Sequence, residues 1–224
     1  MNLRSIRFFL IVLFSFQLIQ IPLQAQVPPI NRYDDVIRSF LHSDSVSTPK
    51  KGGILFIGSS SIGRWNDLEE RFRDYTLIRR GFGGSTFAEI LHYSKDILFP
   101  YRPSKIFLYA GENDLVQGKS VAEIMQTIEQ IHDQIKQTLP FTSLYIISVK
   151  PSNKLKAYSS EIQVLNDRIE KYIAQANCAA YYVDIYQGML DEHGAPNADL
   201  FVSDQLHLTP EGYDVWEKEI RKYL

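Results

Sequence analysis

Cysteine is almost absent from the 224-residue sequence: Cys178 is the only one, so no intrachain disulfide can form. Neither sign of charge is in excess, because 24 lysines and arginines face 26 aspartates and glutamates for a formal net charge of −2. A nearly neutral chain gives no electrostatic reason to bind nucleic acid or an anionic membrane surface. No internal repeat, low-complexity tract or linker divides the sequence. With 45% hydrophobic residues, it predicts one folded domain with a sizeable core.

Residues 1–25 have the pattern of a secretory signal peptide. Arg4 and Arg7 form a basic start, residues 8–16 are an apolar run, and Ala25 is a small residue suited to cleavage. The alternative is a retained membrane anchor, but two glutamines interrupt the apolar stretch before the ~20 residues that a membrane span needs. We therefore expect cleavage, a secreted or periplasmic protein, and no stable membrane association afterwards.

The rest of the chain divides into a lead-in segment, residues 26–50, and a domain, residues 51–224. The lead-in segment contains a short helical pattern over residues 33–41, and we expect it to pack on the domain. In the domain, apolar runs alternate with helical patterns, and runs that are apolar on both faces are typical of strands in a buried parallel sheet. The runs cover residues 53–57, 75–78, 105–110, 143–149 and 180–185.

Helical periodicity fills the gaps between these runs. Apolar residues recur at spacings of three and four over residues 121–139 and 162–173, and Ser120 with Glu123 forms a capping-box signature. The last helix is expected to begin directly after Thr209, its N-cap. The alternation predicts an α/β fold of three layers, α/β/α, around a doubly wound five-stranded parallel sheet. Such sheets bind ligands at the carboxyl ends of their strands.

Four loops carry candidate chemistry. The first presents serines, and the second is rich in glycines that let backbone N–H groups approach a ligand. The third offers the Asn113 amide as a donor to an oxyanion. The fourth holds Asp204 and His207 three positions apart, so that the carboxylate can orient the imidazole. In order, the loops are residues 57–63, 80–86, 110–114 and 203–210.

Each loop alone also has an ordinary structural explanation, such as a capping serine, a flexible turn or an Asx turn. A nucleotide site is excluded, because Thr86 stands where a third glycine is needed and no Walker lysine is present. No spacing of His, Cys and acidic residues suits a metal, so we expect no metal and no cofactor. Two further acid-x-x-His pairs fall within predicted helices, where we expect solvated faces: Glu89 with His92, and Glu129 with His132.

Taken together, the four loops resemble the sequence blocks of the SGNH (GDSL-type) hydrolase superfamily, which contribute Ser, Gly, Asn and His in that chain order. The blocks here are residues 58–60, 81–86, 111–114 and 204–207. The resemblance covers about residues 53–224 and implies the flavodoxin-like fold of that superfamily.

By position, the resemblance implies Ser60 as the nucleophile, His207 as the general base and Asp204 as the acid that orients it. It also implies three oxyanion donors: the backbone N–H groups of Ser60 and Gly84, and the side-chain amide of Asn113.

One departure concerns the residue before the implied nucleophile, where the family usually has aspartate and this chain has Ser59. The change leaves open which of Ser59, Ser60 and Ser61 attacks, although alignment on the preceding glycine favours Ser60. In the family that aspartate mainly makes structural hydrogen bonds, so we expect activity to survive its loss.

The resemblance implies a secreted serine esterase that hydrolyses short acyl esters through an acyl-enzyme, with a small ester or an acetylated glycan as its partner. For a carbohydrate O-acetylesterase, candidate sugar contacts near the strand ends are Trp65, Asn66, Tyr109 and Tyr158, although such aromatics more often pack in the core. Alternatives are a lysophospholipase-type acylhydrolase and a non-catalytic ligand- or glycan-binding protein on the same scaffold.

Overall fold

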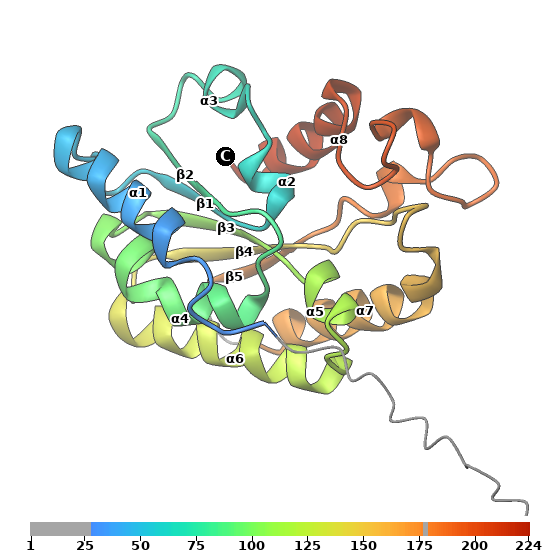
Figure 1. Ribbon diagram of the computed structural model, residues 1–224, viewed down its shortest axis with the longest axis horizontal. Helices are drawn as coiled ribbons and strands as arrows, with labels where there is room; N and C mark the ends of the chain where they lie inside the picture. Colours follow the sequence, from blue (N-terminus) through green and yellow to red (C-terminus); the bar gives the residue numbers. More distant parts are fainter. Residues whose placement is uncertain (1–27, 177–178) are drawn as a thin grey trace, which may run out of the picture.

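A five-stranded, all-parallel sheet forms the centre of the molecule, with strand order β2-β1-β3-β4-β5 (Figure 1). The strands are β1 Ile54–Gly58, β2 Leu77–Gly81, β3 Lys105–Tyr109, β4 Ser143–Ile147 and β5 Ala180–Val183. Because β1 lies inside the sheet and the chain winds outward from it in both directions, the expected doubly wound fold is confirmed, with the flavodoxin-like strand order.

This computed structural model describes residues 28–176 and 179–224. The expected signal peptide and Cys178 lie outside the described residues.

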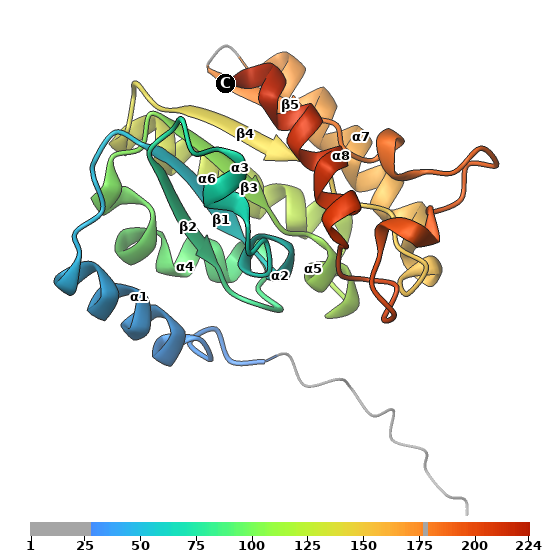
Figure 2. The ribbon, with the colours of Figure 1, turned by 90° about the horizontal axis from the view of Figure 1, so that it is seen from above.

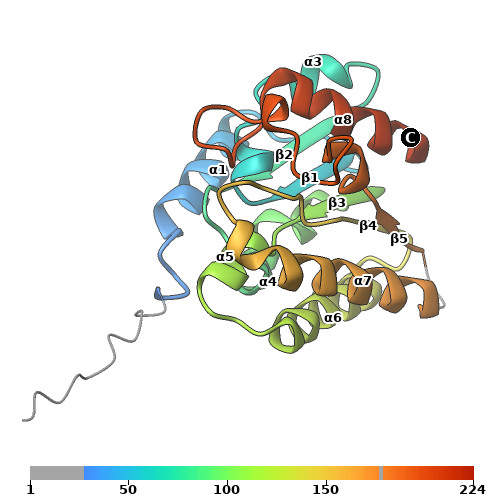
Figure 3. The same ribbon diagram turned by 90° about the vertical axis from the view of Figure 1, so that its right-hand side faces the viewer.

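Helices cover both faces of the sheet and complete the expected three layers (Figures 1 and 3). On one face pack α1, α4, α6 and α7, and on the other α2, α3 and α8, while the short α5 follows β3. Their bounds are α1 Asp34–Val46, α2 Ser60–Gly63, α3 Leu68–Arg71, α4 Phe87–Ile97, α5 Glu112–Val116, α6 Val121–Thr138, α7 Ser159–Gln175 and α8 Pro210–Ile220.

The core divides into two hydrophobic clusters because successive residues of a strand face opposite sides of the sheet. Leu55 and Ile57 of β1 belong to the cluster under α4, α6 and α7. Ile54 and Phe56 belong to the cluster under α2, α3 and α8. All four side chains are buried, which explains why β1 is a continuous apolar run in the sequence.

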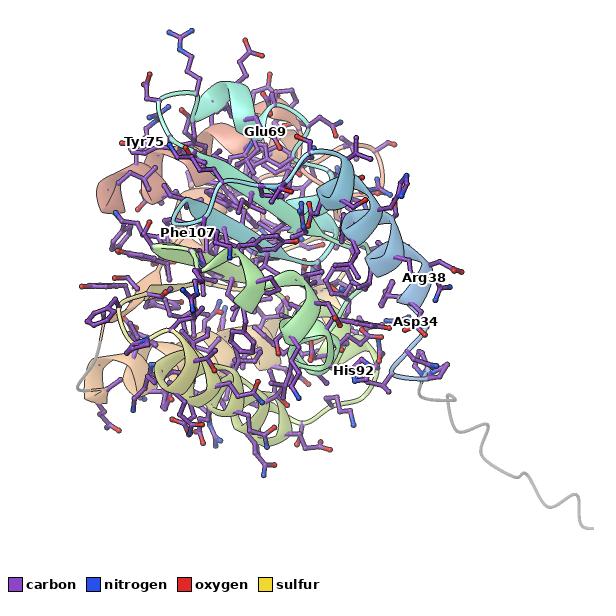
Figure 4. The ribbon with its side chains drawn as sticks, turned by 90° about the vertical axis from the view of Figure 1, so that its left-hand side faces the viewer. Asp34, Arg38, Glu69, Tyr75, His92 and Phe107 are labelled. Atoms are coloured by element: carbon purple, nitrogen blue, oxygen red, sulfur yellow. The ribbon has the colours of Figure 1, made fainter. Side chains whose placement is uncertain are left out.

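A ladder of stacked aromatic rings runs in strand register through the second cluster and ends at the exposed Tyr181. Phe56, Phe107, Tyr145 and Tyr181 are aligned partners on β1, β3, β4 and β5. Successive ring centroids lie 4.9, 4.7 and 4.8 Å apart. Such pairs contribute about 0.5–1.5 kcal/mol each beyond their buried area. Figure 4 shows Phe107 in the interior, at the level of the strands.

Strand β2 begins later than the sequence indicates, at Leu77 rather than residue 75, and continues through Arg79 and Arg80. These arginines fit an edge strand because their guanidinium groups find partners beside the sheet. Arg79 donates to the carbonyls of Gly63 and Trp65, at 3.2 and 3.0 Å. The two arginines interrupt the apolar pattern from which the expected strand, residues 75–78, was read, so the pattern did not show that β2 continues to Gly81.

Side-chain caps mark the starts of α6 and α8. The expected capping box of Ser120 and Glu123 begins α6. Thr209 accepts from the Gly212 N–H at the start of α8, also as expected. Helix α1 is longer than its sequence pattern indicates, and it packs along α4 beside the β2 edge of the sheet (Figure 2).

Candidate active site

The first predicted loop makes a tight turn from β1 into α2. A Cβ on Gly58 would lie 2.1 Å from the carbonyl oxygen of Tyr109, so only glycine fits this close approach of neighbouring strands. Ser60 is the first residue of α2 and is half-buried, whereas Ser59 and Ser61 are buried, at 0% and 1% exposure. Of the three serines that the sequence leaves as candidates, only Ser60 has its hydroxyl at a histidine.

That histidine is His207, 147 residues further along the chain. Its Nε2 lies 3.0 Å from the Ser60 Oγ. Its Nδ1 lies 2.6 Å from Asp204 Oδ2. When the Nδ1–H group donates a hydrogen bond to the carboxylate, Nε2 carries no hydrogen and can accept the hydrogen bond from the Ser60 hydroxyl.

The Asp204 carboxylate is fixed by its backbone as well as by the imidazole. Its Oδ1 accepts the N–H groups of Leu206 and His207, both at 2.9 Å. The hydrogen bond from the His207 side chain, together with these backbone donors, holds the pKa of Asp204 well below its ordinary value. The group facing the imidazole is therefore a carboxylate anion at neutral pH.

A network that the sequence did not indicate supports the loop between this acid and base. Gln205 has a left-handed backbone, with φ of 55°, which is uncommon outside glycine. The Ser152 hydroxyl donates to the Gln205 carbonyl at 2.7 Å, and the Asn153 amide donates to its side-chain oxygen at 2.9 Å. The segment after β4 thus holds the loop that carries Asp204 and His207.

The glycine-rich second loop lies against the turn that carries Ser60. A Cβ on Gly83 would come within 3.8 Å of the Ser60 Cβ, and Gly84 has a left-handed φ of 81°. Asn113, at the start of the third loop's helix α5, donates one amide hydrogen to the Ser85 carbonyl at 3.0 Å. The first three loops therefore meet around Ser60.

Each expected oxyanion donor still has a hydrogen to give. The backbone N–H groups of Ser60 and Gly84 donate to no acceptor in the part of the chain that the structure describes. Asn113 uses only one of its two amide hydrogens on Ser85. Three donors and a serine hydroxyl that is bonded to an imidazole can together support acyl transfer.

A buried ion pair, also missed by the sequence analysis, lies beside the third loop. Lys150 pairs with Glu112, and the two side chains are only 1% and 5% exposed. Asp114, on the other side of Asn113, accepts the Phe87 N–H at 3.1 Å, and burial raises its pKa to about 7. Glu112 and Asp114 find their partners on other elements of the fold, so no local sequence pattern indicates these contacts.

Two of the remaining acid-x-x-His residues do not lie on the solvated faces that we expected. Glu89 is buried, because it completes a capping box with Thr86 at the start of α4 and pairs with Arg32. His132 is buried too, with its Nδ1 2.7 Å from the Tyr172 hydroxyl. The Thr-x-x-Glu spacing at Thr86 was a readable signal of the first arrangement, whereas the second depends on packing between α6 and α7.

Among the described residues, no group of three or more His, Cys, Asp or Glu side chains could hold a metal ion. Within the same ranges, no helix has the length and apolar character needed to cross a membrane.

A family model described as the GDSL-like lipase/acylhydrolase family matches residues 56–215, which include all four loops. The chain belongs to this family. Its members are hydrolases that act on ester bonds, as the resemblance of the loops implies. None of the curated proteins that were compared matches the chain.

Solved structures share the fold. A GDSL-like lipase of Bacteroides thetaiotaomicron is 24% identical, with a TM-score of 0.72 over 84% of this chain and 96% of its own. A Streptococcus pneumonia protein, provisionally described as a platelet activating factor, is 24% identical, with a TM-score of 0.77 over 87% and 93%. A family 3 carbohydrate esterase of Clostridium thermocellum is 18% identical, with a TM-score of 0.61 over 76% and 95%.

Proposed function

We propose that this GDSL-family hydrolase is a serine esterase that hydrolyses short acyl esters through Ser60, His207 and Asp204. The observation that supports the proposal most strongly is the 3.0 Å separation between the Ser60 Oγ and the His207 Nε2. A serine hydroxyl is a weak nucleophile on its own, and a base within hydrogen-bonding distance activates it.

In the proposed reaction, the Ser60 Oγ attacks the ester carbonyl carbon while His207 Nε2 takes the hydroxyl proton. The imidazolium that forms is stabilised by the Asp204 carboxylate at Nδ1. Nε2 then gives the proton to the leaving alcohol, and the acyl group stays on Ser60. Water attacks this acyl-enzyme, with His207 again as the base, and releases the carboxylic acid and the free serine.

The negative oxygen of each tetrahedral intermediate would accept hydrogen bonds from the N–H groups of Ser60 and Gly84 and from the Asn113 amide. Loss of one such donor typically costs ~3–4 kcal/mol of transition-state stabilisation. Asn113 suits this role because its amide donates without changing protonation state.

We propose that the alcohol part of the ester is a carbohydrate, so that the substrates are acetylated carbohydrates. Support comes from the shared fold of the Clostridium thermocellum carbohydrate esterase, although at 18% identity this similarity establishes the fold alone. Two of the candidate sugar contacts are withdrawn: Trp65 and Tyr109 are both 0% exposed and pack in the core. Asn66 is exposed, and Tyr158 is half-buried against the core.

The direct test is a panel of p-nitrophenyl acetate, butyrate and octanoate alongside an acetylated xylooligosaccharide. We expect hydrolysis of the acetyl ester and of the sugar acetate, and a fall of kcat by roughly 10⁴-fold or more in Ser60→Ala. Ser203→Ala removes an exposed hydroxyl next to Asp204 and serves as the matched control. A wild-type protein that hydrolyses none of the four esters would contradict the proposal.

We also propose that residues 1–25 direct export and that the protein works outside the cytoplasm. Expression in a bacterial host with the full sequence should yield protein in the periplasm or medium whose mass matches a start at residue 26. Recovery of uncleaved protein in the membrane fraction would favour the retained anchor instead.

A further inference from the structure

The lead-in segment reaches the glycine-rich loop of the candidate site. The Tyr33 hydroxyl donates to the carbonyl of Gly83 at 2.7 Å, and Arg32 Nη2 donates to the carbonyl of Gly84 at 2.8 Å. Both side chains come from outside residues 56–215, the range that the family model matches. The two contacts join parts of the chain that are 50 and 52 residues apart.

The Tyr33 contact acts on the peptide unit that carries the Gly84 N–H. Gly83 supplies the carbonyl of this unit and Gly84 its N–H. The unit is planar and trans, so the two groups point in opposite directions. A donor that fixes the carbonyl on one side therefore fixes the direction of the N–H on the other. A hydrogen bond at the carbonyl also polarises the unit, which strengthens the N–H as a donor.

The next peptide unit is held on both sides as well. Its carbonyl, from Gly84, accepts from Arg32, and its N–H, from Ser85, donates to the Phe82 carbonyl at 3.2 Å. Gly84 between the two units has a φ of 81°, a conformation open to glycine but costly for other residues. With both flanking planes anchored, Gly84 has little freedom to rotate its N–H.

The anchoring side chains are themselves held in place. Arg32 pairs with Glu89, the buried residue that completes the capping box of α4, through Nε at 2.5 Å and Nη2 at 3.1 Å. Its guanidinium lies 4.6 Å from the centroid of the Tyr33 ring, which packs edge-on against Phe82 at 5.1 Å. Figure 4 shows Asp34, the residue that follows Tyr33, on the same side of the molecule as His92 of α4.

We propose that Tyr33 and Arg32 are positioning residues that aim the Gly84 N–H at the oxyanion of the reacting ester. The inference rests on the proposed function, because it assigns to the lead-in segment the orientation of a donor used only in that reaction. Neither side chain touches substrate in this account. Both act through the two peptide units that flank Gly84.

The test compares Tyr33→Phe with Tyr101→Phe in the mature protein. The Tyr101 hydroxyl donates to Asp44 of α1 at 2.6 Å and accepts from Arg80 Nε at 2.7 Å. Its loss therefore also removes hydroxyl hydrogen bonds between the α1 segment and the domain, but near the opposite end of that helix. With p-nitrophenyl acetate, we expect Tyr33→Phe to lower kcat by roughly tenfold or more, with KM within about twofold of the wild type. Tyr101→Phe should leave both constants within about twofold of the wild type.

A second readout is independent of turnover. In an amide NMR spectrum, the Gly84 resonance should move in Tyr33→Phe and stay in place in Tyr101→Phe, because only the first change removes the bond at its peptide carbonyl. Thermal unfolding of both variants then shows whether a fall in kcat reflects general destabilisation.

The outcomes separate the two proposals. Wild-type hydrolysis with an unchanged kcat in Tyr33→Phe, or equal losses in both variants, would overturn the positioning role and leave the esterase intact. A wild-type protein without esterase activity would overturn the proposed function and, with it, this inference.

Discussion

Replacing Asp204 by asparagine tests the proposed orientation of His207, because the structure dictates how the new amide must turn. Asp204 Oδ1 accepts two backbone N–H groups, and only an oxygen can take that place. The asparagine NH₂ must then occupy the position of Oδ2, facing His207 Nδ1. A donor there forces Nδ1 to become an acceptor, which moves the imidazole proton to Nε2.

In that tautomer, Nε2 donates to the Ser60 Oγ and cannot take its proton. A wrong tautomer of this kind lowers turnover by ~10⁴-fold, which corresponds to about 5 kcal/mol of transition-state stabilisation. The loss should appear in kcat rather than in KM, since the carboxylate does not contact substrate in the proposed reaction.

The assay is the initial rate of p-nitrophenyl acetate hydrolysis at neutral pH. Asp191→Asn is a close control, because the Asp191 carboxylate also accepts two backbone N–H groups, from His193 and Ala195, at 2.9 Å each. That variant should retain wild-type kcat. A kcat of Asp204→Asn within about tenfold of the wild type would refute the reasoning from tautomers.

Three other outcomes are expected. Lys150→Met leaves the buried Glu112 charge without its partner and should lower the unfolding free energy, measured in urea, by ~3–5 kcal/mol. Most of this loss should be regained when Glu112→Leu is added. A loss below about 1 kcal/mol would contradict the prediction. Burial raises the pKa of Asp114 to about 7, so the folded state holds this proton more tightly, and the stability it contributes falls as pH rises from about 4 to 7. Asp114→Asn should therefore gain stability over the wild type at pH 8, by up to ~4 kcal/mol, and much less at pH 4, and equal effects at both would refute the assignment. Asn113→Ala should lower kcat on p-nitrophenyl acetate by ~100-fold or more with little change in KM, and a near-normal kcat would remove its amide from the oxyanion site.

Continuous apolar runs and cap signals were the features of the fold that the sequence revealed best. Strand β3 begins where its apolar run begins, and α6 begins directly after the Ser120 cap, because burial on both faces and local capping leave plain patterns. Helices α3 and α5 escaped notice, since helices of four or five residues are too short to show a period.

The residues grouped around Ser60 could be expected because parallel strands end at one edge of the sheet, which brings distant loops together. The contacts that support these residues could not be expected from the sequence. The pairs Lys150 with Glu112 and Arg32 with Glu89 join residues 38 and 57 positions apart. Charged residues are ordinarily solvated, so only their packing in the folded chain shows that all four are paired and that Lys150, Glu112 and Glu89 are buried.

The most direct test of the central claim is the site of covalent labelling by an organophosphonate ester, mapped by mass spectrometry of proteolytic peptides. The account predicts one adduct per chain, on Ser60, formed in step with the loss of esterase activity and absent from Ser60→Ala. An adduct on Ser59, Ser61 or any other serine that tracks inactivation, or an active protein that forms no adduct, would contradict it.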